Sequence, residues 1–303
     1  MSSQPQDAST SVVVLTYNGE KYLRQVLEMI QRQKAKAVEI IVIDSGSTDG
    51  TLEIVRLSAA DLHQIPRSEF GHSTTRNLVA RIARGKYIAF LTQDATPADS
   101  CWLDRLLAAF QYSPNVAGAF SRQVPRPGSD LLNANDLHMY FKEKGQVRTH
   151  PQDAARWKRD LWKCMQFSNA SALYEKELLL QNPFDEELPV GEDQEWAKRM
   201  LEKGYRIVYQ PESIVLHSHD HTLTEKYHRN LEMGAGFAKF LSPILGRRRF
   251  PLGAWLFHVG SDIAFLISFR APMKDKLKWL LRSPLHRAAM HYAYYKGWNS
   301  ALA

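Results

Sequence analysis

Polar side chains follow three short apolar runs in the first hundred residues of this 303-residue chain. The apolar runs cover residues 11–15, 38–43 and 87–91, and each is too short for a helix and typical of a buried strand. The polar groups after them are Thr16-Tyr17-Asn18, then Asp44-Ser45-Gly46-Ser47-Thr48-Asp49-Gly50, then Thr92-Gln93-Asp94-Ala95. Each group alone is equally well explained as a turn or a helix cap. Their joint placement favours one binding crevice, because parallel strands bind ligands beyond their carboxyl ends.

Two later segments add groups that can transfer protons or bind a metal. Glu192 and Asp193 precede an apolar helical pattern, and a carboxylate there can accept the proton of an attacking hydroxyl. The alternative is that these acids only begin a helix, where they suit its dipole. His217 and His219 can complete a metal site with Asp94, or can be buried, hydrogen-bonded histidines.

The elements that must position these residues alternate between strands and helices. Apolar residues recur with helical spacing in residues 20–32, 51–57, 72–84 and 97–110. Such repeated units predict an α/β fold, with a mostly parallel sheet between layers of helices. The chain has no G-x-G-x-x-G and no G-x-x-x-x-G-K-[ST] motif, which argues against dinucleotide oxidoreductases and P-loop proteins.

The second half is expected to cross over the site and then return to the sheet. Residues 121–160 are irregular and rich in Pro, Asn, Arg and Lys, whereas 167–174, 206–209 and 214–216 are typical of strands. Residues 193–203 have a helical pattern, and the chain is helical and rich in aromatic residues from about residue 225.

The order of these motifs resembles that of family 2 glycosyltransferases with the GT-A fold. The resemblance begins with Ser-Val-Val-Val-Leu-Thr-Tyr-Asn-Gly and Ile-Ile-Val-Ile-Asp-Ser-Gly-Ser-Thr-Asp-Gly-Thr, and extends over about residues 10–220. Thr92-Gln93-Asp94-Ala95 occupies the place of that family's Asp-x-Asp metal motif, and Glu192-Asp193 that of its Glu-Asp motif. Phe70–Asn77 and Thr92–Ala95 are similar to the rhamnosyltransferase branch.

The resemblance implies a GT-A-like catalytic domain at 1–225 and a helical, basic extension at 226–303. Within the catalytic domain, residues of about 10–120 would hold the nucleotide-sugar and those of about 121–225 the acceptor. Asp193 would be the catalytic base, with Glu192 beside it contacting acceptor or donor. The donor site would contain Thr16, Tyr17, Asn18, Asp44, Ser45, Arg76 and Gln93.

Asp44 would read the pyrimidine N–H, and Arg76 would reach the diphosphate unless it is a solvent-facing helix residue. Mg²⁺ or Mn²⁺ would be held by Asp94 with His217 or His219, less tightly than in the family because one carboxylate is missing.

These roles together predict an inverting glycosyltransferase of surface glycan biosynthesis. The expected donor is dTDP-rhamnose, with a UDP-sugar as the alternative, and the expected acceptor is a lipid-linked or growing polysaccharide. Two rivals remain at this point: a nucleotidyltransferase, which lacks support because no Gly-rich loop follows the first strand, and a non-catalytic sugar-binding protein on a degenerate fold.

Composition and charge bear on location and partners. The two cysteines, Cys101 and Cys164, fit a reducing compartment, and the N-terminus has no secretory pattern, so a cytoplasmic protein is expected. Residues 226–303 hold 13 Lys/Arg against 3 Asp/Glu, whereas the rest of the chain is slightly acidic. This asymmetry favours peripheral attachment to the anionic cytoplasmic face of the inner membrane over nucleic acid, for which no motif is present. A packed helical subdomain or a homodimer through the C-terminal helices is the alternative.

Overall fold

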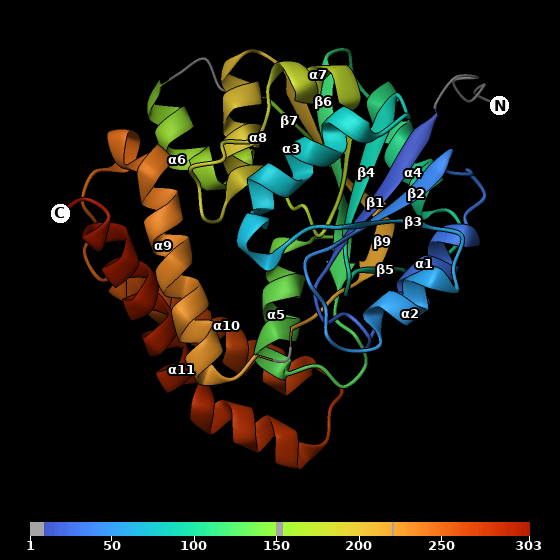
Figure 1. Ribbon diagram of the computed structural model, residues 1–303. Coiled ribbons are helices and arrows are strands. Elements are labelled where there is room, and N and C mark those ends of the chain that lie inside the picture. Colours follow the sequence, from blue (N-terminus) through green and yellow to red (C-terminus); the bar gives the residue numbers. More distant parts are fainter. Residues whose placement is uncertain (1–8, 150–153, 220) are drawn as a thin grey trace. The chain divides into compact units, whose positions relative to one another are not determined.

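The computed structural model describes residues 9–149, 154–219 and 221–303 and divides them into two compact units (Figure 1). The sheet unit runs to Val124 and continues with Phe141–Glu187 and Glu192–His217. The helical unit comprises Pro125–Tyr140, Leu188–Gly191 and Ser218–Ala303. The two units therefore interleave along the chain, and the domain bounds 1–225 and 226–303 stay a prediction.

The sheet unit is built on one nine-stranded, mostly parallel sheet in the order β3-β2-β1-β4-β8-β6-β9-β5, with β7 paired to β9. Its strands are β1 (Thr10–Thr16), β2 (Glu39–Asp44), β3 (Asp61–Gln64), β4 (Tyr87–Thr92), β5 (Thr96–Pro97), β6 (Val116–Val124), β7 (Gln146–Arg148), β8 (Ser171–Glu175) and β9 (Arg206–Leu216). The first four strands in this order are parallel, and β8 is antiparallel to both of its neighbours. The two strands expected at 206–209 and 214–216 form one continuous strand, β9. Its pairing with β6 shifts register between them, because Ser121 pairs with Gln210 and the next residue, Arg122, pairs with Ile214.

Helices cover both faces of this sheet. They are α1 (Leu23–Gln31), α2 (Thr51–Arg56), α3 (His72–Ile82), α4 (Trp102–Ala108), α6 (Ala154–Met165), α7 (Lys176–Gln181) and α8 (Glu192–Glu202), with short 3-10 turns at Arg67–Glu69 and Ala109–Gln111. On one face, α1, α2 and α4 pack on alternate residues of the strands, such as Val12 and Val14 of β1. On the other, Phe90 and Tyr174 pack edge to face, and Tyr174 contacts Trp196 of α8 in the same way.

The irregular region expected over residues 121–160 contains regular structure. It continues β6 as far as Val124 and then includes a helix of the helical unit, α5 (Leu131–Tyr140), before β7 and α6 of the sheet unit. Within α5, the polar residue Asn135 is buried and donates a hydrogen bond to Asp262 at 2.8 Å.

The helical unit consists of α5, α9 (Leu223–Leu245), α10 (Leu252–Ser268) and α11 (Met273–Ser300). A capping box between Thr222 and Glu225 begins α9. Leu131 and Leu132 of α5 share a small core with Leu266 of α10 and Trp279 of α11. Within the residues described, no helix combines the length and the apolar character that crossing a bilayer requires.

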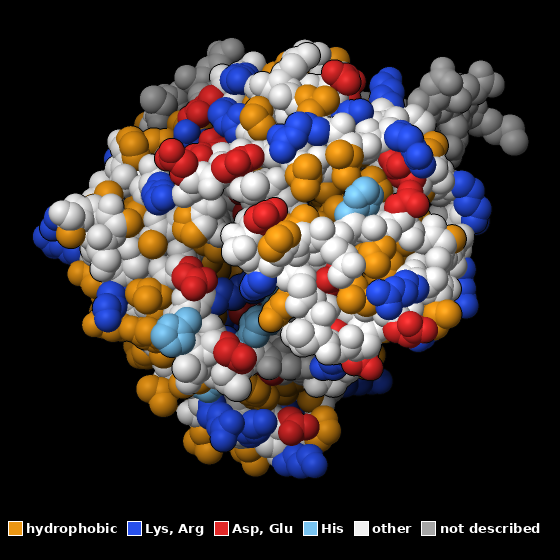
Figure 2. All heavy atoms as spheres, viewed as in Figure 1, with side chains coloured by type: hydrophobic (Ala, Val, Ile, Leu, Met, Phe, Trp, Pro, Cys, Tyr) orange, Lys and Arg blue, Asp and Glu red, His pale blue; other side chains and the backbone are white. Residues whose placement is uncertain are grey.

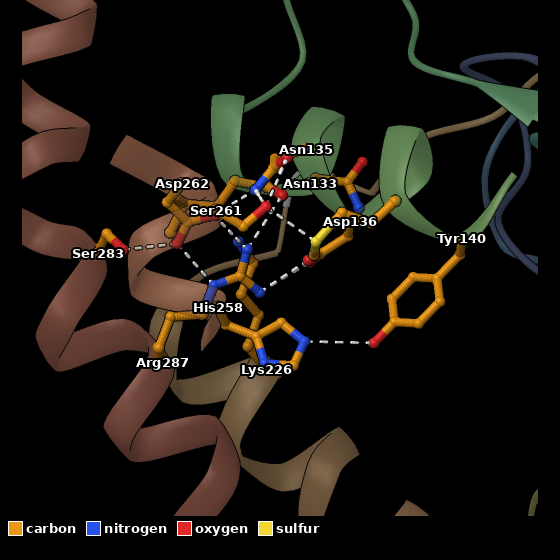
Figure 3. A network of polar contacts seen from close by, with 12 residues as sticks. Asn133, Asn135, Asp136, Tyr140, Lys226, His258, Ser261, Asp262, Ser283 and Arg287 are labelled. Atoms are coloured by element: carbon orange, nitrogen blue, oxygen red, sulfur yellow. Dashed lines mark hydrogen bonds and ion pairs between the residues drawn. The ribbon is translucent and has the colours of Figure 1, made fainter. Parts of the chain in front are cut away.

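A buried network of charges also ties α5, α10 and α11 together (Figure 3). Asp262 accepts hydrogen bonds from Arg287 at 2.6 and 2.8 Å, from Ser283 at 2.5 Å and from Asn135 at 2.8 Å. Arg287 also pairs with Asp136 of α5 at 2.8 Å. Because buried charges must keep their partners, this network fixes which side of α10 and of α11 faces inward.

Candidate active site

The three polar strand ends predicted from the sequence lie side by side in the sheet. Thr16, at the end of β1, is the register partner of Asp44 at the end of β2. On its other side, Leu15 of β1 is the partner of Thr92 at the end of β4. The parallel register therefore places the segments after β1, β2 and β4 at one edge, where parallel sheets bind ligands.

Gln93 joins the end of β1 to the end of β4. Its side-chain oxygen accepts hydrogen bonds from the Thr16 hydroxyl at 2.7 Å and the Tyr17 N–H at 2.8 Å, and its amide donates to the Tyr17 carbonyl at 3.1 Å. A Cβ at Gly19 would lie 2.5 Å from the Thr16 hydroxyl and 2.6 Å from the Gln93 oxygen, so a side chain there would displace the Thr16–Gln93 hydrogen bond. These bonds preorganise the loop that follows β1.

Asp44 is fully buried and holds the loop that follows β2. Its carboxylate accepts the Gly46 and Ser47 N–H groups, both at 3.0 Å, and also the Ser47 hydroxyl. Asn18 joins this loop to the first one, because its N–H donates to Ser47 and its side-chain oxygen accepts from the Thr48 N–H at 2.9 Å. The role of Asp44 in reading a base stays a prediction beside this structural one.

Arg67 extends the same edge and was missed in the sequence. Its guanidinium lies 4.2 Å from the centre of the Tyr17 ring, which is 40% exposed, and 3.4 Å from the Ser45 hydroxyl. It follows β3, a four-residue strand with little apolar pattern, so the periodicity of the sequence did not reveal it. The result is a cation beside an accessible aromatic ring, which suits an anionic aromatic ligand.

Asp94 and His217 come together from the ends of two distant strands. The Nε2 atom of His217 lies 3.5 Å from a carboxylate oxygen of Asp94. His219 follows two residues later, at the start of a segment of the helical unit, and its part in a metal site stays a prediction.

The other ring nitrogen of His217, Nδ1, is hydrogen-bonded within the protein. Nδ1 lies 2.7 Å from the Gln123 side-chain oxygen and donates to it, while the Gln123 amide donates to Ser168 at 2.8 Å. Nε2 is the nitrogen that faces Asp94, and a histidine whose Nδ1 is hydrogen-bonded to a side-chain oxygen in this way is typical of metal-binding sites.

Glu192 and Asp193 begin α8, and the structure gives them different surroundings. Glu192 is buried and accepts hydrogen bonds from Arg76 at 2.8 Å and from the Asn169 side chain at 3.1 Å. Asp193 is partly exposed and accepts the Asn169 backbone N–H at 3.0 Å and its neighbour's N–H at 2.8 Å. Asn169 is itself oriented by the Tyr174 hydroxyl, which donates to its side-chain oxygen at 2.5 Å.

These surroundings separate the acidities of the two carboxyl groups. Burial and the neighbouring Glu192 carboxylate raise the pKa of Asp193 to about 7. Burial would also raise the pKa of Glu192, but Arg76, His72 and the Asn169 hydrogen bond together lower it. A carboxyl group that changes protonation near neutral pH is suited to proton transfer, whereas one held ionised by an arginine is not.

Arg76 of α3 is buried against Glu192 and also donates to the His72 carbonyl at 3.0 Å. The solvent-facing alternative considered from the sequence is therefore wrong, whereas the role of Arg76 at a diphosphate stays a prediction. The pairing escaped sequence reasoning because 116 residues separate the two partners. Asn169 escaped it as well, although a polar Ser-Asn pair between Phe167 and Ala170, just before a strand, is a signal that could have been used.

Comparisons with known proteins agree with this geometry. Residues 11–181 match the model of glycosyl transferase family 2. The O-antigen chain rhamnosyltransferase RfbN of Salmonella typhimurium is 31% identical over 300 residues, which cover 96% of this chain and 90% of that protein. The O-antigen chain rhamnosyltransferase WbaN of Salmonella anatum is 29% identical, with the same shares covered.

Solved structures resemble the fold at low sequence identity. The mannosyltransferase PcManGT from Pyrobaculum calidifontis, in complex with GDP-Man and Mn²⁺, has a TM-score of 0.61 at 19% identity and covers 97% of this chain and 86% of its own. Glucosyl-3-phosphoglycerate synthase from Mycobacterium tuberculosis, with Mn²⁺ and UDP, has a TM-score of 0.56 at 19% identity and covers 80% and 82%. The GT-A-like fold expected from the sequence is thereby confirmed.

The family model spans more than half of the chain, and RfbN exceeds 30% identity across nearly all of it. The chain therefore belongs to glycosyl transferase family 2 and is a glycosyltransferase.

Proposed function

We propose that this enzyme transfers L-rhamnose from dTDP-rhamnose to a lipid-linked or growing polysaccharide in the synthesis of a surface glycan, and that it inverts the anomeric centre. Two O-antigen rhamnosyltransferases that align over 96% of the chain support the sugar and the acceptor class. The Phe70–Asn77 and Thr92–Ala95 motifs support the same branch. A UDP-sugar is the alternative donor.

The surroundings of the Asp193 carboxylate are the observation that supports the proposed mechanism. This carboxylate is partly exposed, anchored by two backbone N–H groups at the start of a helix, and acidic enough to be ionised just above neutral pH. In the proposed role it accepts the proton of the acceptor hydroxyl as the hydroxyl attacks the sugar. A single base and direct displacement leave no covalent intermediate, and the configuration is therefore inverted.

The edge formed by the loops after β1, β2 and β4 is proposed to hold the nucleoside diphosphate. Thr16, Tyr17, Asn18, Asp44, Ser45 and Gln93 are its predicted donor-binding residues, and all of them lie in the hydrogen-bonded edge described above. Arg67 is added to them, because its guanidinium lies beside the accessible Tyr17 ring. Arg76 is proposed to hold Glu192 in place.

Asp94, His217 and His219 are proposed to bind the divalent cation, Mn²⁺ or Mg²⁺. A carboxylate oxygen and an imidazole nitrogen that lie 3.5 Å apart are ligand types that fit a metal ion. Imidazole suits first-row transition ions better than it suits Mg²⁺, so Mn²⁺ fits these residues better. The cation would stabilise the negative charge that develops on the diphosphate leaving group.

Transfer is proposed to take place at the cytoplasmic face of the inner membrane. A lipid-linked acceptor is confined to that surface, and the +10 net charge of residues 226–303 suits its anionic lipids. A homodimer through the C-terminal helices is the alternative use of the same segment.

The donor is tested by incubating the enzyme with Mn²⁺, a lipid-linked glycan acceptor and, separately, dTDP-rhamnose, UDP-glucose, UDP-galactose and GDP-mannose. We expect turnover of dTDP-rhamnose and a rhamnosyl product whose anomeric configuration, read by NMR, is opposite to that of the donor. Asp193→Asn should lose transfer, by roughly 10²–10⁴-fold, and keep donor binding. Selective turnover of a UDP-sugar would refute the rhamnose assignment, and retention of configuration would refute the mechanism.

A further inference from the structure

The N-terminal half of α11 has three parallel rows of side chains with different properties. Trp279, Ser283 and Arg287, spaced four residues apart, are buried against the rest of the helical unit. Residues four apart lie along one side of a helix, so each such set forms a row. The apolar row consists of Met273, Leu277, Leu281 and Leu285. The basic row consists of Lys274, Lys278 and Arg282.

The apolar row is exposed. Its four side chains are between 53% and 81% accessible, although each is large and hydrophobic. With 100° of rotation per residue, this row lies opposite the buried row and the basic row lies between the two. The buried pairing of Arg287 with Asp262 fixes the rotation of the helix, so the apolar row cannot turn inward without breaking a charged network (Figure 3).

Helix α10 adds a second exposed apolar row. Leu252, Leu256, Ile263 and Ile267 share one side of this helix and are all exposed, while Asp262 and Leu266 are buried. Figure 2 shows hydrophobic side chains next to Lys and Arg side chains over the first turns of α11. An exposed apolar row along a helix is a surface that commonly contacts a partner or a membrane.

We propose that the exposed rows of α10 and α11 are a docking surface for an anionic lipid bilayer, with the apolar rows inserted among the acyl chains and Lys274, Lys278 and Arg282 on the lipid phosphates. An apolar side flanked by Lys and Arg is the pattern of helices that lie in the plane of a membrane interface.

The positive charge of α11 favours a membrane over a second copy of the chain as the partner of this surface. In a two-fold symmetric dimer both copies use the same surface, so the two basic rows would be brought toward each other. Residues 273–285 carry four basic side chains and one acidic one, Asp275, so such a contact would be repulsive. An anionic bilayer is complementary to the same charges.

The test is co-sedimentation of the full-length protein with vesicles of phosphatidylcholine alone, and with vesicles in which phosphatidylglycerol makes up about a third of the lipid. We expect binding to the anionic vesicles only, weakened by high salt because the Debye length is only about 8 Å at physiological ionic strength. Replacing Lys274, Lys278 and Arg282 together with Gln should weaken binding roughly a hundredfold, since each charge contributes about fivefold.

Two further variants separate charge from insertion. The combined changes Leu277→Ser, Leu281→Ser and Leu285→Ser should weaken binding at low and at high salt alike, because they remove apolar insertion. The matched control replaces Arg24, Arg32 and Arg56, exposed residues of the sheet unit, with Gln and should leave binding unchanged although the net charge falls equally.

Three results would overturn the proposal: wild-type protein that stays in the supernatant with anionic vesicles at low salt, equal losses in the control and the basic-row variant, or a dimer in solution that the serine variants convert to a monomer. Binding is measured without donor or acceptor, so this test is independent of the proposed transfer reaction.

Discussion

At the scale of single residues, the site contains two carboxyl groups next to each other in sequence with opposite tasks. Glu192 is held ionised by Arg76, while Asp193 has its pKa raised to about 7 by burial and by Glu192. The other ionisable groups that act on this pair are His72 from α3 and Tyr174 from β8. The charge on Glu192 therefore controls the pH range in which Asp193 can accept a proton.

This arrangement predicts the direction of a shift in the pH profile. Asp193 must be ionised to act as a base, so kcat/KM should rise with pH, reach half of its plateau near pH 7 and level off about one unit above that. Glu192→Gln removes the neighbouring negative charge and leaves the positive charge of Arg76, so the pKa of Asp193 falls. The rise should therefore move by at least about one unit to lower pH. Arg76→Gln should move it to higher pH.

The pKa itself is measured by NMR of enzyme labelled at the Asp side-chain carboxyl carbons, with the resonance assigned by its loss in Asp193→Asn. Glu202→Gln is the control, because it makes the same charge change at the far end of α8, roughly 15 Å away at 1.5 Å per residue. A uniform loss of activity at every pH, with an unmoved pKa, would mean that Glu192 acts through shape alone.

A second prediction at this scale concerns the metal. Asp94→Asn keeps the shape of the side chain and removes its charge, so transfer should fall at least about a hundredfold, since a metal ion supplies several kcal/mol at the leaving group. Mn²⁺ affinity, followed by EPR of the free ion, should fall with it. Asp61→Asn, an exposed acid at the start of β3, is the control and should change neither. Activity of the wild type in excess EDTA would contradict a metal requirement.

At the scale of elements, the helical unit depends on a close contact between α9 and α11. A Cβ at Gly234 would lie 2.0 Å from the Tyr294 carbonyl oxygen, and one at Gly297 would lie 1.9 Å from the Leu231 carbonyl oxygen. Both obstacles are backbone atoms, which cannot rotate away as a side chain can. The two glycines thus allow the helices to pack backbone against backbone.

Gly297→Ala should therefore destabilise the protein by about 1–3 kcal/mol or more, as overpacked sites do. Gly260→Ala is the matched control, because nothing lies within 4 Å of a Cβ there and the residue is in the middle of α10. That change should instead stabilise by about 0.5–1 kcal/mol, the gain of alanine over glycine in a helix. The free energy of unfolding is measured by denaturant titration followed by circular dichroism, and equal effects of both changes would contradict the close contact.

At the scale of the whole molecule, donor and metal binding should raise the thermal stability of the protein. A ligand that binds only the folded state at a hundred times its Kd contributes about 2.7 kcal/mol, which is several degrees in Tm. We expect dTDP with Mn²⁺ to raise Tm more than UDP or GDP does, and Asp94→Asn to abolish the part that depends on Mn²⁺. A larger shift with GDP would argue against the proposed donor.

The sequence alone determined the strand ends, the α/β alternation and the place of Asp193 at the start of a helix, because these features depend on residues that are close together in the chain. Apolar periodicity and polar strand ends are local patterns, and the parallel register then brought Thr16, Asp44 and Thr92 to one edge as expected. The basic character of the C-terminal quarter was equally a matter of composition.

Only the tertiary structure decided which of these residues act on one another. Arg76 contacts Glu192, His217 approaches Asp94, and Arg287 binds Asp262, across separations that no periodic pattern encodes. Each of these contacts depends on how distant elements pack, and packing also decided the exposed side of α11. Leu277 and Trp279 are both apolar in the sequence. In the structure, Trp279 packs into the core of the helical unit, and Leu277 is therefore left exposed on another side of α11.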